Sequence, residues 1–91
     1  MEFGEMIISK SIEPNGKLKI LKENGERYIG EHRHGIPNGK GQQTWPGGQV
    51  YVGSFKDGLR DGWGVCTYPS GKKQNEYFIK GKHIKNRKLE K

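Results

Sequence analysis

The feature that most constrains the fold of this chain is a repeat with a period of 23 residues. The stretch 51–71 matches the stretch 28–48, and the identical positions include seven Tyr, Gly and Pro pairs. Self-similarity at a fixed period of roughly 20 to 50 residues is typical of stacked units that cannot bury a face alone. The matched pairs are Tyr51 with Tyr28, Gly53 with Gly30, Gly58 with Gly35, Gly62 with Gly39, Gly64 with Gly41, Pro69 with Pro46 and Gly71 with Gly48.

Each unit predicts an antiparallel β-hairpin. Along 50–55, Tyr51, Gly53 and Phe55 alternate with the residues at 50, 52 and 54, which places the two sets on opposite faces of a strand. Residues 56–62 carry two Asp-Gly turn signals, and 63–68 is again β-branched and aromatic, so it should return antiparallel. A Pro-Ser-Gly turn at 69–71 then leads into the next unit.

Four glycines lie inside these predicted strands: Gly30, Gly41, Gly53 and Gly64. Glycine weakens a strand, so its presence at the same places in both units indicates a bulge or room for a neighbouring ring against the backbone. We interpret these glycines as structural.

The pattern Tyr-x-Gly-x-Phe, followed by Gly, Gly-x-Gly and a closing Gly, resembles the MORN (membrane occupation and recognition nexus) motif. The resemblance is strong over 27–71. Upstream, the Asn-Gly-Lys at 15–17 lies one period before the same residues at 38–40. Downstream, Phe78 and Gly81 keep the phase, but Gln74 and Glu76 replace the family tyrosine and glycine, so a third unit is partial.

We therefore expect an all-β fold, an elongated single-layer antiparallel β-meander of MORN-type hairpins with a basic C-terminal tail. Strands are expected at 5–12, 17–21, 27–32, 40–45, 50–55, 63–68 and 73–79. The expected divisions are an N-terminal hairpin or degenerate half-repeat cap (1–26), two repeats (27–49 and 50–72), a partial terminal repeat (73–81) and the tail (82–91).

The net charge of +7 is concentrated at the C-terminal end. Residues 1–71 contain nine Lys or Arg and eight Asp or Glu, whereas residues 72–91 contain eight and two. Electrostatic affinity for an anionic surface should therefore come mainly from the tail. Its expected anion-binding residues are Lys80, Lys82, Lys85, Arg87, Lys88 and Lys91.

The aromatic residues of the repeats are the candidate partner-binding site. A sheet without a second layer leaves the rings on one face either partly exposed or covered by a partner, and exposed aromatic patches often mark binding sites. The alternative is that the rings only fill the repeat. The residues are Tyr28, Trp45, Tyr51, Phe55, Trp63 and Tyr68.

Catalytic, cofactor and metal chemistry are not expected. The sequence shows no nucleophile or acid–base pair that a pocket would hold. His32 and His34 would share a strand face, but no further zinc ligands are visible, and Cys66 is the only cysteine. The Gly-x-Gly segments at 39–41 and 62–64 lead into strands, whereas phosphate-binding loops lead into helices.

The resemblance implies a non-catalytic scaffold or structural subunit, in a larger assembly, that binds a protein through its aromatic face. The alternative function is peripheral binding of anionic phospholipid or phosphoinositide membranes. A third and less favoured function is binding of the nucleic-acid backbone through the tail. With one cysteine, no basic N-terminal leader and no long apolar run, we expect an intracellular, reducing location, cytoplasmic or associated with cytoskeleton or membrane.

Overall fold

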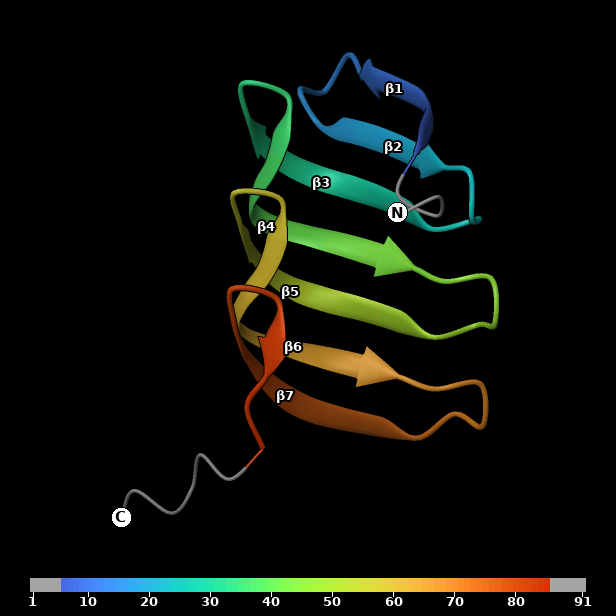
Figure 1. Ribbon diagram of the computed structural model, residues 1–91, viewed down its shortest axis with the longest axis vertical. Helices are drawn as coiled ribbons and strands as arrows, with labels where there is room; N and C mark the ends of the chain where they lie inside the picture. The colour runs from blue at the N-terminus through green and yellow to red at the C-terminus, as the bar shows by residue number, and fades with distance from the viewer. Residues whose placement is uncertain (1–5, 86–91) are drawn as a thin grey trace.

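The computed structural model describes residues 6–85, which form eight β-strands and no helix (Figure 1). All neighbouring strands are antiparallel, and their order in the sheet is their order in the chain. The predicted all-β meander in one open sheet is therefore confirmed. The strands are β1 (Ile7–Ile12), β2 (Leu18–Lys22), β3 (Arg27–Arg33), β4 (Ile36–Thr44), β5 (Val50–Lys56), β6 (Leu59–Thr67), β7 (Lys73–Ile79) and β8 (Lys82–His83).

Strands β4 and β6 begin earlier than the sequence predicted. Each has nine residues, starting at Ile36 and Leu59 rather than at 40 and 63. The turns before them need only two residues, His34-Gly35 and Asp57-Gly58, which all have positive φ. Two consecutive positive φ angles characterise the tight type I′ hairpin turn, whose twist matches that of the strands.

Asp61-Gly62, which was interpreted as a second turn, lies inside β6 and serves the next hairpin instead. The Asp61 carboxylate accepts a hydrogen bond from the Lys80 backbone N–H at 3.0 Å. One period earlier, the Asn38 side chain accepts from the Asp57 backbone N–H at 3.2 Å. Each of these side chains therefore binds the turn of the hairpin that follows.

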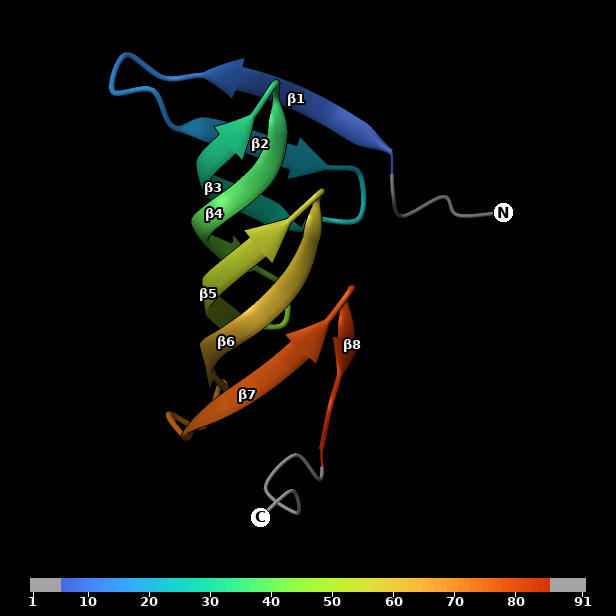
Figure 2. The ribbon, with the colours of Figure 1, turned by 90° about the vertical axis from the view of Figure 1, so that its left-hand side faces the viewer.

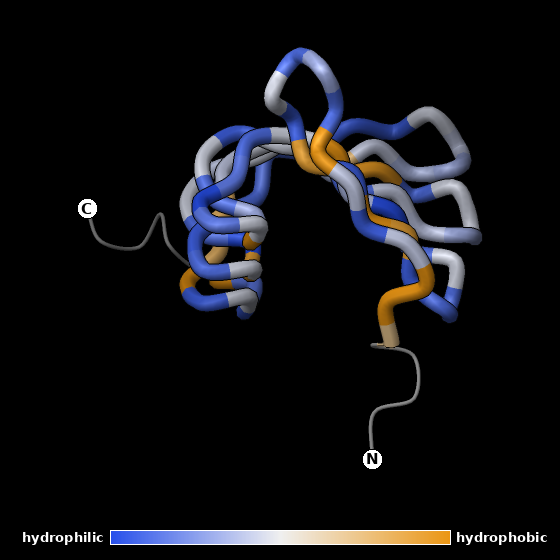
Figure 3. The backbone as a smooth tube through the Cα atoms, turned by 90° about the horizontal axis from the view of Figure 1, so that it is seen from above, coloured by the Kyte–Doolittle hydropathy of each residue, from blue (hydrophilic) through white to orange (hydrophobic). Residues whose placement is uncertain are grey.

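The sheet is bent into an arch, which Figure 3 shows along the stack. The bend falls where Gly39 and Gly62 have φ near 99° and 97°, and where the register shifts after Gly30 and Gly53. An extra residue in one strand bends it, and glycine adopts positive φ without strain. We call the concave side of the arch the inner face and the convex side the outer face. The tips of successive hairpins stack along one side of the arch (Figure 2).

Aromatic rings on the inner face form the core. Tyr28 contacts Phe55 edge-on with ring centroids 4.9 Å apart, Phe55 contacts Tyr51 at 5.4 Å, and Tyr51 contacts Phe78 at 5.4 Å. Edge-to-face contacts of this kind add about 0.5–1.5 kcal/mol each to the burial term. Leu18, Ile20 and Cys66 complete the buried cluster. Curvature of a single layer is thus enough to bury rings that we expected to stay partly exposed.

The glycines of the repeat make room for the tyrosines. The Tyr51 ring lies so close to Gly64 that a Cβ at this position would overlap the ring carbons, and its hydroxyl lies 2.8 Å from where a Cβ of residue 53 would stand. That hydroxyl donates to the Ser54 carbonyl at 3.0 Å. Tyr28 lies on Gly30 and Gly41 in the same way and donates to a backbone carbonyl three residues on. Each ring therefore covers two glycines on neighbouring strands.

The repeat stops at β8, which has only two residues. Lys85 stands one period after Gly62, and a lysine adopts positive φ only with strain. Ile84 stands one period after Asp61 and has no carboxylate to hold another turn. Within residues 6–85, the long, bent strand seen in β4 and β6 is therefore not formed a third time.

Candidate docking surfaces

An apolar groove opens on the inner face between the two sides of the arch. Its volume is about 250 Å³, and its lining comes from the β1 and β2 strands on one side and from the hairpin tips on the other. Ile7 and Ile36 remain 45% and 47% exposed there. We name this surface the inner groove; it is lined by Ile7, Lys10, Ile20, Lys22, Glu26, Arg27, Tyr28, Gly35, Ile36, Pro37, Gln43, Phe55 and Gly58.

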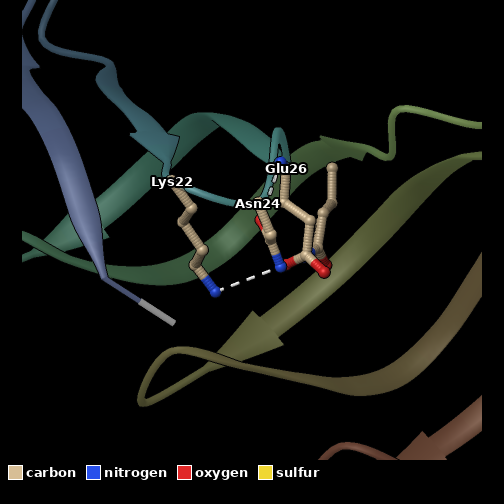
Figure 4. A network of polar contacts seen from close by, with 4 residues as sticks. Lys22, Asn24 and Glu26 are labelled. Carbon is tan, nitrogen blue, oxygen red and sulfur yellow. Dashed lines mark hydrogen bonds and ion pairs between the residues drawn. The ribbon is translucent and has the colours of Figure 1, made fainter. Parts of the chain in front are cut away.

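A polar network borders the groove at the turn between β2 and β3 (Figure 4). The Glu26 carboxylate lies 3.5 Å from the Lys22 ammonium and accepts a hydrogen bond from Gln43 at 3.4 Å. The Asn24 side chain accepts from the Glu26 backbone N–H at 2.9 Å, which is an Asx-type turn. This network ties β2, the turn and β4 together.

Five of the six aromatic residues predicted to bind a partner belong to the inner core, and Trp63 does not. Tyr28, Tyr51 and Phe55 expose 5%, 0% and 5% of their surface. Trp45 and Tyr68 are partly buried against the same cluster. Trp63 is 54% exposed on the outer face, because it alternates with Gly64, whose Cβ direction points to the inner ring of Tyr51. The six rings therefore do not form one surface.

Arg60 is an inner residue that the sequence analysis missed. Its guanidinium lies 4.5 Å from the Phe78 ring centroid, 5.1 Å from that of Trp45 and 5.9 Å from that of Tyr51. A guanidinium over ring faces is favourable by about 0.5–2 kcal/mol, depending on its exposure. A signal was present in the spacing, because Arg60 stands one period after Pro37, so that a cation replaces a proline of the groove wall.

A buried carboxylate replaces the family glycine in the terminal unit. Glu76 is 5% exposed and accepts hydrogen bonds from the Tyr68 hydroxyl at 2.5 Å, the Gln74 amide at 2.7 Å and the Cys66 thiol at 3.1 Å. His83, which stacks on Phe78 at 5.2 Å, has its Nε2 3.9 Å from the carboxylate.

The titration of these groups follows from the cluster. Burial acts to raise the pKa of Glu76, but the hydrogen bonds from Tyr68, Cys66 and Gln74 outweigh it and hold the pKa below its ordinary value. Burial, aided by the hydrogen bond to Glu76, raises the pKa of the Cys66 thiol to about 11. The hydrogen bond to Glu76 raises the pKa of Tyr68 to about 12. Cys66 is therefore a protonated, buried thiol, unlike nucleophilic cysteines, which have low pKa values.

Within residues 6–85, no three His, Cys, Asp or Glu side chains are placed to hold a metal ion. The His32 ring nitrogen instead accepts a hydrogen bond from the Gly35 backbone N–H at 3.0 Å, which closes the turn after β3. The same part of the chain contains no helix long and apolar enough to cross a membrane.

The outer face carries exposed apolar side chains in a row across the strands. Val52 pairs with Val65 between β5 and β6, and Trp63 pairs with Tyr77 between β6 and β7. Val52 is 51% exposed and Val65 is 37% exposed. A hollow of about 430 Å³ lies beside them. None of these side chains takes part in the inner core.

The predicted anion-binding tail is described only in part. Lys80, Lys82 and Lys85 are exposed around the last hairpin. Arg87, Lys88 and Lys91 lie outside the described residues. Ile79, beside this group, is 46% exposed.

A comparison of the sequence with known families identifies the repeat. The sequence pattern of the MORN repeat matches residues 28–50 and 51–73, which is just over half of the chain. The chain belongs to the MORN repeat family. No curated protein sequence matches it.

Proposed function

We propose that this chain is a non-catalytic scaffold that holds a segment of a protein partner in the inner groove. The observation that carries the proposal is the pair of exposed isoleucines, Ile7 and Ile36, that face one hollow from different parts of the sheet. Apolar side chains around a concave surface are typical of peptide-binding sites.

Rigidity of the groove wall supports the proposal. The Gly58 backbone N–H donates to the Pro37 carbonyl at 2.9 Å, and the Gly81 N–H donates to the Arg60 carbonyl at 2.8 Å. These bonds link each hairpin tip to the previous hairpin. A preformed wall lowers the entropic cost of binding, since fewer residues are ordered by the partner.

The burial of the rings changes where the binding energy should lie. Tyr51 has no exposed surface that could contact a partner directly. Its role as a direct anchor for the partner therefore remains a prediction, and it would require the groove to open. We expect the accessible side chains of the groove, Ile36 and Ile7, to make the larger share of direct contacts with the partner. A buried apolar anchor at the centre of an interface contributes about 2 kcal/mol or more.

Affinity purification with matched variants tests the proposal. Ile36→Glu places a charge in the groove, whereas Ile29→Glu makes the same change at a 43% exposed position on the outer face. We expect one stoichiometric protein to copurify with the wild type and with Ile29→Glu, and to be lost with Ile36→Glu. Retention of that protein by Ile36→Glu, at unchanged melting temperature, would exclude the inner groove as its site.

The alternative function is peripheral binding to anionic phospholipid. The exposed Lys80 follows the exposed Ile79 in the chain, and the exposed Lys82 pairs with it across the last hairpin. This combination of cations and an aliphatic side chain suits a headgroup surface. Cosedimentation with phosphoinositide vesicles should weaken with salt, since exposed charges are screened within about 10 Å at about 0.1 M. Lys82→Glu with Lys85→Glu should weaken it at every salt concentration. Binding that is insensitive to both would exclude this mechanism.

A further inference from the structure

The outer face carries an exposed aromatic pair that the inner groove does not use. Trp63 on β6 and Tyr77 on β7 are directly paired across the strands. Their ring centroids are 5.0 Å apart with the planes tilted by 55°. Trp63 is 54% exposed, and it is the largest of the exposed side chains described on the outer face. An exposed tryptophan beside a second ring, on a rigid sheet, is a preformed aromatic surface.

Hollows lie on both sides of Trp63. One, of about 430 Å³, is bordered by Val52, Val65 and Lys40. The other, of about 570 Å³, reaches the edge of β7 and is bordered by Tyr77 and Lys85. Asn75 borders both and is exposed. The Trp63 indole therefore projects between the two hollows, and the Asn75 amide borders both of them.

We propose that this outer surface binds a proline-rich segment in the polyproline II conformation, with an acidic residue at each end. Proline rings pack well against exposed aromatic side chains, and such a segment presents carbonyls without needing strand partners. The Trp63 indole N–H and the Asn75 amide are donors suited to those carbonyls. A β-strand ligand would pair with a free backbone edge, such as that of β7 at residues 73–76, and it would then extend the sheet beside β7 instead of covering Trp63, which lies one strand further in on β6.

The charged side chains around the ring pair determine which residues suit the two ends of the bound segment. Lys40 borders one hollow and Lys85 the other, so cations lie on both sides of the ring pair. Glu76 also reaches the second hollow, but it is buried and both its oxygens accept hydrogen bonds from this chain. The groups that remain for a ligand are therefore positive.

The span fits a short peptide. Strands β4 to β7 cover three strand spacings, which is about 14 Å at about 4.8 Å each. A polyproline II helix rises about 3.1 Å per residue, so about five residues cross from the Lys40 side to the β7 edge. A hexapeptide with glutamate at each end and four central prolines matches this distance.

Tryptophan fluorescence of the full chain tests the proposal directly. In Trp45→Phe, Trp63 is the sole tryptophan, since the chain has two. Titration with the capped hexapeptide Glu-Pro-Pro-Pro-Pro-Glu should give a saturable blue shift with Kd below about 1 mM. The peptide with lysine at both ends should bind at least about tenfold more weakly, and Glu-Gly-Gly-Gly-Gly-Glu should give no saturable shift.

Variants assign the site. Trp63→Ala, measured by calorimetry with wild-type Trp45 retained, should lose binding, and Trp63→Phe should retain part of it. Lys40→Glu should weaken the glutamate-ended peptide, while Lys19→Glu, an equal charge change on an exposed residue of β2, should not. Absence of a saturable shift up to about 1 mM, or equal binding by both tryptophan variants and the wild type, would overturn the proposal.

The two faces are tested separately. The inner-groove variant Ile36→Glu should leave hexapeptide binding unchanged, and Trp63→Ala should leave the copurified partner of the inner groove in place. Failure of the wild-type chain to bind the hexapeptide, while a partner still copurifies through the inner groove, would refute only the outer site. Hexapeptide binding by a wild-type chain with which no partner copurifies would refute only the proposed function.

Discussion

The second repeat and the terminal hairpin place different chemistry at the same point of the sheet. In the second repeat, Tyr51 lies over Gly53 and Gly64 and is completely buried. One period later, Gln74 and Glu76 stand where Tyr51 and Gly53 stood. The carboxylate of Glu76 then occupies the inner face and is satisfied by three hydrogen-bond donors.

The difference shows how a repeat of this kind ends. A ring against bare backbone needs two glycines on neighbouring strands, so it can form only where another repeat strand follows. A buried carboxylate needs donors instead. Cys66 supplies one from β6, Tyr68 supplies one from the position directly after β6, and Gln74 supplies one from β7. The terminal unit therefore exchanges ring packing for a hydrogen-bond cluster, which requires no further strand.

The largest effect should come from removing the ring of the second repeat. Tyr51→Ala leaves a cavity between Phe55 and Phe78, with an expected loss of about 3–5 kcal/mol in the free energy of unfolding. Gln74→Ala at the matching position should lose only about 1 kcal/mol, the value of one hydrogen bond. Urea denaturation measures both. Equal losses would mean that the two units are held by the same kind of contact.

A smaller loss should follow from filling the space under a ring. In Gly53→Ala, the new methyl carbon would lie 2.5 Å from the Gly64 Cα and 2.7 Å from the Trp63 carbonyl oxygen. We expect a loss of about 2–3 kcal/mol, although alanine favours strands more than glycine does. Gly47→Ala is the control, since its Cβ would meet nothing within 4 Å. A thermal melt in which both variants resemble the wild type would show that the glycines are not required.

Removing the charge of the terminal cluster should cost less and should change the pH dependence. Glu76→Gln is expected to lose about 1–2 kcal/mol at neutral pH, because hydrogen bonds to a charged acceptor are stronger. The pKa of Glu76 is lowered by folding, so its contribution is fully present above the ordinary glutamate pKa of 4.5 and is lost as the pH falls through the folded pKa.

The measurement for this prediction is stability as a function of pH in acid. The wild type should lose more stability than Glu76→Gln as the pH falls below about 4.5, so the two curves should converge. Parallel curves would mean that Glu76 titrates as it does in the unfolded chain. Gln74→Glu is not a suitable control, because it changes the same cluster.

The smallest effect should come from the side chains that bind the next turn. Asp61→Ala should lose about 0.5–1 kcal/mol and should increase hydrogen exchange at the Lys80 amide, to which Asp61 is bonded. Asn38→Ala should do the same at Asp57, one repeat earlier. The change should be local in each case. Faster exchange at Asp57 in Asp61→Ala would contradict the independence of the two links.

Residue spacing alone identified the repeat and its architecture. The period of 23 residues, the alternation around Tyr51 and Phe55 and the turn glycines predicted a meander of hairpins, since these are local properties with a fixed period. The motif residues within the period carried the resemblance to the MORN family. The prediction that Asp61-Gly62 forms a turn was wrong, and the cause is also local. An Asp-Gly pair allows positive φ at the glycine in a turn and in a bent strand alike, and the contact of Asp61 with Lys80 is visible only in the structure.

Tertiary structure decided which surfaces are open. Alternation places residues on two faces, but not which face becomes concave, so the sequence could not show that Tyr51 is fully buried while Trp63 is exposed. Arg60 over three rings and Glu76 among three donors depend on residues from different strands brought together by the arch. Strand order follows from local spacing, whereas burial depends on curvature, which arises from bulges and glycine φ angles acting over the whole sheet.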